Sequence, residues 1–390
     1  MMWHVIHLAD LLLWLFMAAS VAYVLLFAVA SLFTPKKWKR AVQAGAVSTH
    51  TFLVLIPAYK EDKVIRATVS NFLAQDYPQD NYRLVVISDR MQADTNQWLA
   101  AQPVELLTPT FDKSSKAKAL QYAMSQTGGA FDYVVILDAD NHVDRDFLSN
   151  LSSACSEGHD TIQCHRVAKN DDNEVALLDG VSEEINNTLF RKAHNNVGLS
   201  AALIGSGMCF GWQWFRDNVC KLDSAVEDRE LEALLLLQGR FVKYEEGILV
   251  KDEKVSSGHT FQRQRLRWMT GQMQSFRRML PNIPRALLTG NIDYIDKTIQ
   301  QMLIPRSILL TVVPLMAVIL TCLNPLWSLK WWGLLAALCA AVYVAIPAPL
   351  RTCRLFSKVG ALPRLTGYML KNLLQIDTGN KDFIHTTHDK

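Results

Sequence analysis

Short apolar runs alternate with longer amphipathic stretches between residues 52 and 278. Four of these runs are rich in β-branched, aliphatic and aromatic residues, which favours β-strands. They are FLVLIPAY (52–59), YRLVVISD (82–89), PVELLT (103–108) and YVVILDAD (133–140). The segments 63–75, 94–101 and 116–126 between them have helical character. Strands that alternate with helices predict an α/β, Rossmann-like fold whose mostly parallel sheet is covered on both faces.

A charge-free run extends from Leu11 to Phe33 and is long enough to cross the hydrocarbon core of a bilayer as a helix. The basic residues Lys36, Lys37, Lys39 and Arg40 follow it. A secretory signal peptide has its positive charges before the apolar region, so this order argues against one. By the positive-inside rule, the chain after Phe33 begins in the cytosol.

Two further charge-free runs, 307–329 and 331–350, predict a transmembrane hairpin with Lys330 between them and a turn around Asn324 and Pro325. Arg306 precedes the pair, and Arg351, Arg354 and Lys358 follow it. Both ends of the hairpin are therefore expected on the cytosolic side. This agrees with the N-terminal run and predicts a multi-pass protein of the cell membrane with a cytoplasmic domain. A buried hairpin of a soluble protein is the alternative.

Just before the hairpin, apolar residues recur at helical spacing with polar residues between them. They are Leu288, Ile292, Ile295, Ile299 and Leu303. The pattern indicates an amphipathic helix, which lies either on the inner membrane surface or against the globular domain. We divide the chain into an N-terminal anchor (1–33), a cytosolic domain (34–280) and a C-terminal region (281–390) with the interfacial helix, the hairpin and a cytosolic tail.

The amino-acid composition limits which kinds of partner the protein is expected to bind. Hydrophobic residues make up 50% of the 390 residues, and the formal net charge is only +3. Because no basic stripe interleaved with aromatics is present, we expect no nucleic-acid partner. The seven cysteines form no CxxC pair, and we interpret them as reduced, mostly buried thiols of a cytosolic domain.

Asp138 and Asp140 end the fourth apolar run in the sequence LDADN. Ligands of such sheets bind outside the carboxyl ends of the strands, where Tyr59, Glu61 and Asp89 also lie. Carboxylate oxygens suit Mg²⁺ or Mn²⁺, which complete their shell with water and substrate phosphate. An Asp-x-Asp at a strand end is a simple loop cap about as often as it is a metal site. The interpretation of Asp138 and Asp140 as metal ligands therefore depends on other motifs in the sequence.

Two later motifs supply this support. VEDREL (226–231) either complements a helix dipole or provides a general base, for which we choose Asp228. QRQRLRW (262–268) combines arginines, which suit phosphate oxygens, with Trp268, on which a sugar or base can stack. A basic surface helix near an acidic membrane has the same pattern.

The motifs IPAYKED, VISDR, SKAKAL, LDADN, VEDREL and QRLRW resemble, in order and approximate spacing, those of family-two glycosyltransferases with a GT-A fold. The resemblance covers roughly residues 50–280. Gln264, Arg267 and Trp268 are similar to the QxxRW motif of the membrane-bound branch, which includes cellulose, chitin, hyaluronan and nodulation chito-oligosaccharide synthases.

The resemblance implies a role for each matching residue. Tyr59, Glu61 and Asp89 would contact the nucleoside, and Lys116 would lie near the diphosphate. Asp138 and Asp140 would bind the metal and phosphate, with Asp140 as the direct metal ligand. Asp228 would be the base, while Gln264, Arg267 and Trp268 would line the donor diphosphate and the acceptor entrance. Gly205, Ser206 and Gly207 resemble the loop before the acceptor-contacting segment.

Some positions depart from the family pattern. The second motif reads SDR where Asp-Asp-Gly-Ser is commoner, which weakens the match at Asp89, and Val226 replaces the threonine of Thr-Glu-Asp. His385 and His388 have metal-like spacing, but two ligands make a poor site, and we assign them no role.

The resemblance implies an inverting, Mg²⁺- or Mn²⁺-dependent transfer in one displacement step. The expected donor is a nucleotide sugar, in particular a UDP-sugar, and the expected acceptor is a glycan in polysaccharide synthesis. One alternative is a non-processive transferase that adds one sugar to a lipid acceptor. Another is a catalytically silent membrane component of a polysaccharide assembly complex.

Overall fold

The computed structural model describes residues 2–33, 49–224, 226–255, 257–358, 360, 362–373 and 375. The strands are β1 (Phe52–Tyr59), β2 (Tyr82–Asp89), β3 (Glu105–Leu107), β4 (Tyr133–Ile136), β5 (His142–Val143), β6 (Thr161–Ala168), β7 (Met208–Gly211) and β8 (Lys243–Asp252). The helices are α1 (Met2–Ala30), α2 (Ile65–Phe72), α3 (Ala93–Ala100), α4 (Lys116–Gln126), α5 (Phe147–Cys155), α6 (Glu174–Asn187), α7 (Ala193–Asn196), α8 (Trp212–Val219), α9 (Glu227–Leu237), α10 (Gly258–Met279), α11 (Ile283–Thr289), α12 (Ile292–Met302), α13 (Arg306–Leu323), α14 (Pro325–Ala345), α15 (Cys353–Lys358) and α16 (Leu362–Leu373).

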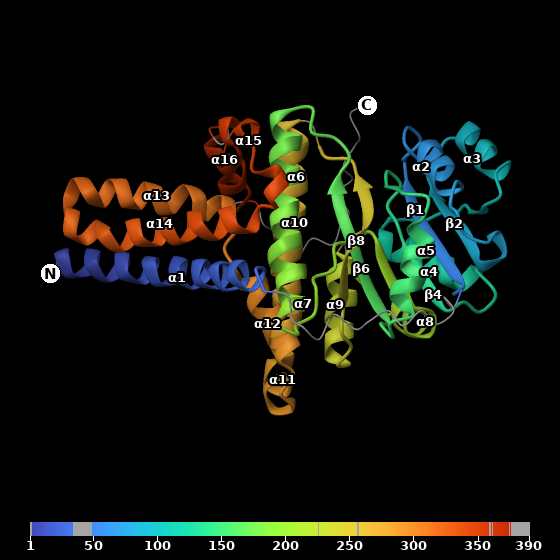
Figure 1. Ribbon diagram of the computed structural model, residues 1–390, viewed down its shortest axis with the longest axis horizontal. Coiled ribbons are helices and arrows are strands. Elements are labelled where there is room, and N and C mark those ends of the chain that lie inside the picture. Colours follow the sequence, from blue (N-terminus) through green and yellow to red (C-terminus); the bar gives the residue numbers. More distant parts are fainter. Residues whose placement is uncertain are drawn as a thin grey trace.

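One eight-stranded sheet, in the order β3-β2-β1-β4-β7-β6-β8-β5, forms the centre of the globular part (Figure 1). The first half is parallel, because β1 pairs in parallel with β2 and β4, and β2 with β3. In the second half, β7 is antiparallel to β4 and β6, and β5 to β8, whereas β6 and β8 are parallel. The predicted α/β fold with a parallel-dominant sheet is confirmed.

Helices cover both faces of this sheet. Val54 and Ile56 of β1 pack into a core with α2 and α5. Leu53 and Leu55, which point to the other face, pack with α4, α8 and α9. A strand buried on both faces needs apolar residues at every position, which explains the unbroken run FLVLI.

The fourth predicted strand is shorter than expected, because β4 ends at Ile136. The backbone N–H of Asn141 donates to the carbonyl oxygen of Asp138 at 3.1 Å, which closes a turn over residues 138–141. Asp138 and Asp140 therefore lie in a turn beyond the strand. The third predicted strand also contracts, to Glu105–Leu107.

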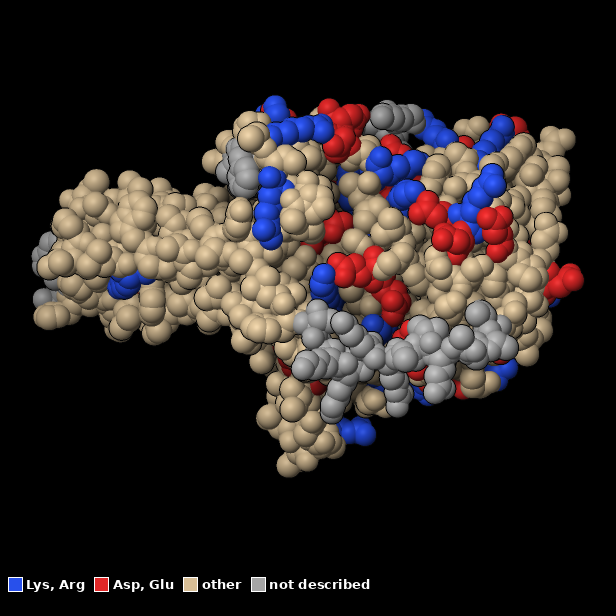
Figure 2. Space-filling view, in the orientation of Figure 1, with Lys and Arg blue, Asp and Glu red and all other residues tan. Residues whose placement is uncertain are grey.

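Among the described residues, three helices are long and apolar enough to cross a membrane, namely the segment His4–Ala30 of α1, α13 and α14. They pack into a bundle that projects from the globular part (Figure 1) around a core that includes Val21, Val313 and Trp331. Figure 2 shows almost no Lys, Arg, Asp or Glu on the visible face of this bundle, whereas the globular part carries charges of both signs.

The hairpin boundaries differ from the predicted runs 307–329 and 331–350. α13 already ends at Leu323, and α14 begins at Pro325 after Asn324, whose side chain accepts a hydrogen bond from the backbone N–H of Trp327. Asparagine at the N-cap followed by proline is a favoured helix start. It sets the boundary between the two helices here, although the charge-free run continues to residue 329.

Lys330 therefore does not separate two helices but lies inside α14, where its ammonium group pairs with Asp10 of α1. The indole N–H of Trp331 donates to the other carboxylate oxygen of Asp10 at 2.8 Å. Asp10 itself lies within α1, which begins well before the predicted start at Leu11. The basic residues at 36–40, and His385 and His388, lie outside the described residues.

The predicted amphipathic helix over 288–303 is broken at Gly290, which adopts the left-handed conformation (φ 66°) and ends α11. In the following helix α12, the buried residues are mainly polar and include Asp296, Lys297 and Thr298. Ile292, Ile299 and Met302 are exposed. The apolar side of α12 is thus the side that faces away from the globular part.

The interpretation of the cysteines as mostly buried is wrong. Cys155, Cys164 and Cys209 are buried, and the four others are exposed. Two of the exposed ones, Cys322 and Cys339, lie on the apolar helices α13 and α14. The sequence alone does not distinguish the apolar outer surface of such a helix from a protein core.

Candidate active site

A cavity of about 520 Å³ opens at the carboxyl ends of β1, β2 and β4 and continues towards the apolar helices. All the site residues chosen from the sequence line it: Tyr59, Glu61, Asp89, Lys116, Asp138, Asp140, Asp228, Gln264, Arg267 and Trp268. Segments from opposite ends of the globular part of the sequence therefore meet in one cavity.

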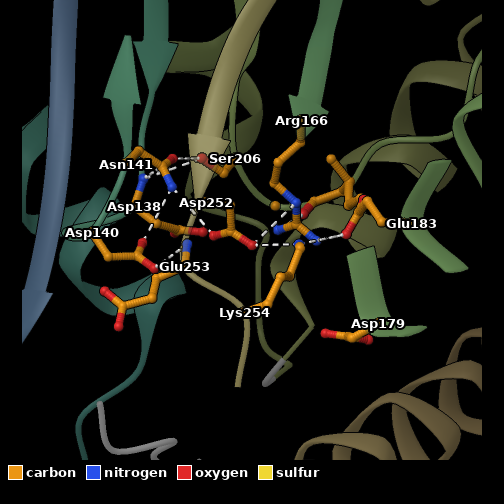
Figure 3. A network of polar contacts seen from close by, with 12 residues as sticks. Asp138, Asp140, Asn141, Arg166, Asp179, Glu183, Ser206, Asp252, Glu253 and Lys254 are labelled. Carbon is orange, nitrogen blue, oxygen red and sulfur yellow. Dashed lines mark hydrogen bonds and ion pairs between the residues drawn. The ribbon is translucent and has the colours of Figure 1, made fainter. Parts of the chain in front are cut away.

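Three carboxylates converge at its centre. Asp138 and Asp140 come from the turn after β4, and Asp252 is the last residue of β8. One oxygen of each lies within 4.8 Å of the others. Asn141 holds the group together, because its amide Nδ2 donates to Asp140 Oδ1 at 3.2 Å and to Asp252 Oδ1 at 3.3 Å (Figure 3).

The donor set of this acidic triad fits a divalent cation. Burial raises the pKa of the Asp140 carboxyl well above its usual range, and the negative charges of Asp252 and Asp138 raise it further. Three crowded carboxylates repel one another, and hard oxygen ligands in this number are what Mg²⁺ and Mn²⁺ accept. Asp138, Asp140 and Asp252 are therefore the residues that could hold such an ion.

Asp252 was not among the residues chosen from the sequence. Its signal in the sequence was weaker, because Lys251 separates it from the short apolar run ILV (248–250), whereas Asp138 directly follows its apolar run. The last apolar run from which we predict a strand ends at residue 140. β6 and β8 mix buried with more exposed residues, so they lack such a run, and Asp252 at the end of β8 was not chosen.

Asp252 is also part of a buried ion-pair network with Lys254, Glu183 and Arg166 (Figure 3). Lys254 Nζ lies 2.7 Å from Asp252 Oδ2 and 3.0 Å from Glu183 Oε2, and Arg166 Nη2 lies 2.9 Å from the same Glu183 oxygen. Burial alone would raise the pKa of Asp252, but Lys254 and Arg166 hold it below its usual value. Asp252 thus stays ionised and fixed in position.

Lys116 connects the triad to the acidic pair of α9. Its Nζ donates to Asp138 Oδ1 at 2.5 Å and to the Gly205 carbonyl oxygen at 2.6 Å, and lies 3.5 Å from Glu227 Oε1. Burial would lower the pKa of Lys116, but the charges of Asp138 and Glu227 more than offset this and raise it. Lys116 is therefore a partly buried cation between two acidic groups.

Glu227 and Asp228 form the first turn of α9. Glu227 is buried, and burial raises the pKa of its carboxyl to about 7 although Lys116 lowers it. Asp228 is only half-buried and lines the cavity. Gly205, at φ 84°, lies so close that a Cβ there would be 3.6 Å from Asp228 Oδ2. The glycine loop thus lies directly against the acidic pair.

The three residues of the Gln-x-x-Arg-Trp pattern lie on α10. Burial lowers the pKa of Arg267, while the nearby carboxylates of Glu227 and Asp138 raise it. α10 also packs directly on Val226, because a Cβ at Gly271 would collide with the Val226 side chain. The position of the acidic pair therefore depends on α10, and valine at 226 has a packing role.

Tyr59 and Asp89 lie side by side at the far end of the cavity, since they are partners in the β1–β2 register. The next residues, Lys60 and Arg90, have positive φ angles of 57° and 55°, which strain side chains other than glycine. Asp89 is buried, and its Oδ1 has no hydrogen-bond partner among the described residues. A buried acceptor of this kind suits an N–H donor of a ligand.

Comparison with known proteins assigns the chain to a family. The family model of glycosyl transferase family group 2 matches residues 133–344, which include the acidic triad, the pair on α9, α10 and the helical hairpin. This is more than half of the chain, and the protein therefore belongs to that family and is a glycosyltransferase.

Two curated relatives share a shorter segment. Cellulose synthase 1 of Komagataeibacter xylinus and cellulose synthase 1 of Novacetimonas hansenii are each 28% identical over 96 residues, 24% of this chain. The match spans only 6% of the length of each relative.

Among solved structures, the fold is similar to that of the mannosyltransferase PcManGT from Pyrobaculum calidifontis in complex with GDP-Man and Mn²⁺. The TM-score is 0.57 at 17% identity, and the match covers 93% of this chain and 98% of the other. At this identity the similarity concerns the fold, and it extends over the apolar helices as well as the sheet.

Proposed function

We propose that the protein is an inverting, metal-dependent glycosyltransferase of the membrane-bound QxxRW branch. It moves a sugar from a nucleotide sugar, a UDP-sugar in the first instance, to an acceptor hydroxyl. The observation that carries this proposal is that one cavity holds the acidic triad, the pair on α9 and Gln264, Arg267 and Trp268 of α10.

The donor would occupy the sheet side of the cavity. Tyr59, Glu61 and Asp89 bind the nucleoside, and Asp89 Oδ1 accepts a hydrogen bond from the base. Asp138, Asp140 and Asp252 hold the divalent cation, which when bound offsets the charge that develops on the leaving diphosphate. Lys116 and Arg267 contribute positive charge to the same region, in a site that burial shields from water.

Asp228 would act as the general base. It takes the proton of the acceptor hydroxyl as that oxygen bonds to the anomeric carbon and the bond to the diphosphate breaks, so that configuration inverts. Glu227, with a pKa of about 7, carries a proton in part of the molecules at neutral pH, which limits the repulsion between the two neighbouring carboxyl groups.

The acceptor has two candidates. A growing glycan in polysaccharide synthesis is supported by the motif resemblance and by the match to the cellulose synthases. A lipid acceptor is supported by the apolar lining of the cavity near the bundle, to which Val24, Phe261 and Ile304 contribute.

For the membrane arrangement, we propose residues 1–33 as an anchor and 34–280 as a cytoplasmic domain. The region 281–390 then holds an interfacial helix and two membrane-crossing helices. The outward apolar side of α12 supports this, because α12 ends at Met302, only a few residues before α13 begins at Arg306.

A screen of nucleotide-sugar donors with Mn²⁺ or Mg²⁺ tests the proposal, with nucleotide release and product mass as readouts. We expect one donor to release its nucleoside diphosphate only when the cation is present. If none of the donors releases its nucleotide with either cation, the proposal is overturned, and the catalytically silent component is favoured.

A further inference from the structure

The end of the cavity away from the acidic triad has a different lining from the donor end. Its apolar residues are Val24, Phe190, Phe261, Ile304 and Met369. Val24 belongs to α1, and Ile304 lies just before α13, so two of the three apolar helices reach this end. A ligand bound here can extend directly into the region proposed to lie in the membrane.

Two arginines lie among these apolar side chains. Arg265 of α10 pairs with Asp179, and its guanidinium lies 4.3 Å from the centre of the Trp268 ring. Arg306 donates to the carbonyl oxygen of Ser182 at 3.0 Å and to Asn186 Oδ1 at 2.8 Å. Asp179, Ser182 and Asn186 have helical spacing on α6, so both arginines bind to one face of that helix.

The hydrogen bonding of both arginines is incomplete. Arg265 Nε and Arg306 Nη1 are buried and have no hydrogen-bond partner among the described residues. No carboxylate in the described part of the chain lies within ion-pair distance of Arg306. A buried cation without a counter-ion and a buried N–H without an acceptor are both unfavourable.

Of the two guanidinium groups, only that of Arg265 is paired with a carboxylate among the described residues, so the charge of Arg306 is not balanced. The two groups are close enough to repel each other electrostatically. An anion with several oxygens would satisfy the open N–H groups and neutralise the excess charge.

This anion is distinct from the diphosphate of the donor. In Figure 3, Asp179 lies on the far side of Lys254 from Asp138 and Asp140. Asp179, the partner of Arg265, is thus separated from Asp138 and Asp140 by Lys254, whose ammonium group pairs with Asp252 and Glu183.

We propose that Arg265 and Arg306 bind the phosphate of a lipid-linked acceptor whose hydrocarbon chain leaves the cavity beside α1 and α13. This inference rests on the proposed function and names its acceptor as a sugar linked to a long-chain lipid through phosphate. A hydroxyl of that sugar loses its proton to Asp228 and bonds to the donor's anomeric carbon, the nucleoside diphosphate leaves, and the lipid phosphate is unchanged.

The test uses the full-length protein in lipid nanodiscs with two acceptors that differ only in the phosphate. One is a sugar linked to a polyprenol through a single phosphate, and the other is the same sugar joined directly to the polyprenol. The water-soluble sugar 1-phosphate serves as a third probe, which separates a lipid phosphate from a free one. Native mass spectrometry measures acceptor binding, and product formation gives KM.

Arg306→Gln keeps donors for Ser182 and Asn186 but removes the charge. We expect it to raise KM for the phosphate-linked lipid about tenfold or more. It should leave KM for the uncharged glycolipid and the affinity for the nucleotide near wild type. Arg306→Lys should recover part of the loss. Arg351→Gln is the matched control, since Arg351 follows α14 near the same bundle but does not line the cavity.

Equal loss with both lipids in Arg306→Gln, or no preference of the wild type for the phosphate-linked lipid, would overturn the inference. Equal use of the soluble sugar 1-phosphate would remove its lipid part. Donor hydrolysis tests the proposed function separately, because it needs no acceptor. If hydrolysis fails but the phosphate-linked lipid still binds in an Arg306-dependent manner, the subsite stands without the reaction.

Discussion

Glu227 and Asp228 are adjacent carboxylates with different surroundings. Glu227 is buried beside Lys116, at 3.5 Å, whereas Asp228 is half-buried and borders the glycine loop. Both residues line the cavity, but Glu227 is buried and paired with Lys116, and we therefore propose Asp228 for the proton transfer and give Glu227 a positioning role.

Asp228→Asn should abolish transfer, with a loss of at least about 10²-fold in kcat, because general-base catalysis contributes about that much or more. Nucleotide affinity should stay close to wild type, since the donor side of the cavity keeps its residues. Equilibrium nucleotide binding and product formation are measured on the same preparation. Normal turnover in this variant would sink the assignment of the base.

Glu227 also gives the folded protein a pH dependence of stability. Its carboxyl has a pKa of about 7 when folded, against an ordinary pKa of 4.5 for an exposed glutamate. The folded state therefore binds the proton more tightly, and the stabilisation is complete below about pH 4.5 and lost as pH rises to about 7. The loss is on the order of 1 kcal/mol or more.

Glu227→Gln removes this titration. In metal-free buffer, the thermal midpoint of the wild type should fall more between pH 5 and pH 8 than that of the variant. Other groups, such as Asp140, titrate in both proteins and cancel in the comparison. Parallel midpoint curves would show that Glu227 does not titrate in this range.

The sequence could indicate those site residues that follow long apolar runs or belong to dense motifs. Asp138, Asp228 and Arg267 are of this kind, and all three line the cavity. Glu183 and Arg306 could not be found in the same way, because their partners are distant in sequence, and Asp252 was missed because Lys251 separates it from the short apolar run of β8. Glu183 is an ordinary polar residue of a helix until Arg166 and Lys254 are placed against it.

At the scale of elements, the packing of α10 on α9 sets the position of the acidic pair. Gly271 leaves no room for a Cβ, because the Val226 side chain occupies that space. Gly271→Ala should therefore destabilise the protein by about 1–3 kcal/mol through overpacking. It should also lower transfer activity by displacing Glu227 and Asp228.

Val226→Ala in the same chain should restore stability and activity in part, because it removes the colliding methyl groups. Gly367→Ala on α16 is the matched control, since a Cβ there meets no atom within 4 Å. Thermal unfolding and nucleotide-sugar turnover measure both effects. A Gly271→Ala protein as stable and active as the Gly367→Ala protein would contradict the packing argument.

Strands were predictable where the apolar run is long and unbroken, and they were missed where it is short, as in β7, or interrupted by polar residues. β1 and β2 are continuous apolar runs, and their bounds match the predicted ones. β6 and β8 contain His165, Arg166 and the pair Glu245 and Glu246, so they do not read as apolar strands. Turn residues decided the remaining errors, as at Asn324, where a cap ended a helix inside a charge-free run.

At the scale of the whole molecule, the helices of the apolar bundle and the neighbouring helices α11 and α12 run in two different directions. α1, α13 and α14 project from the globular part, whereas α11 and α12 run across that direction at the base of the bundle (Figure 1). If the bundle crosses a bilayer, α11 and α12 lie along its surface. This arrangement gives a reason for the exposure of Leu288 (89%), Ile292 (66%) and Ile299 (44%).

Membrane contact at α11 and α12 predicts that single cysteines at Leu288 and Ile292 are protected from a water-soluble maleimide in nanodiscs. Both cysteines should react readily in a mild detergent whose molecules exchange rapidly at the protein surface, because in the nanodisc these positions are covered by lipid and not by protein. The background carries serine at the four exposed cysteines, Cys220, Cys322, Cys339 and Cys353. Ser153→Cys, exposed on α5 on the other side of the sheet, is the control and should react equally in both media. Fast labelling of Leu288→Cys in nanodiscs would mean that this apolar surface faces water or another protein, and the proposed interfacial position would have to be abandoned.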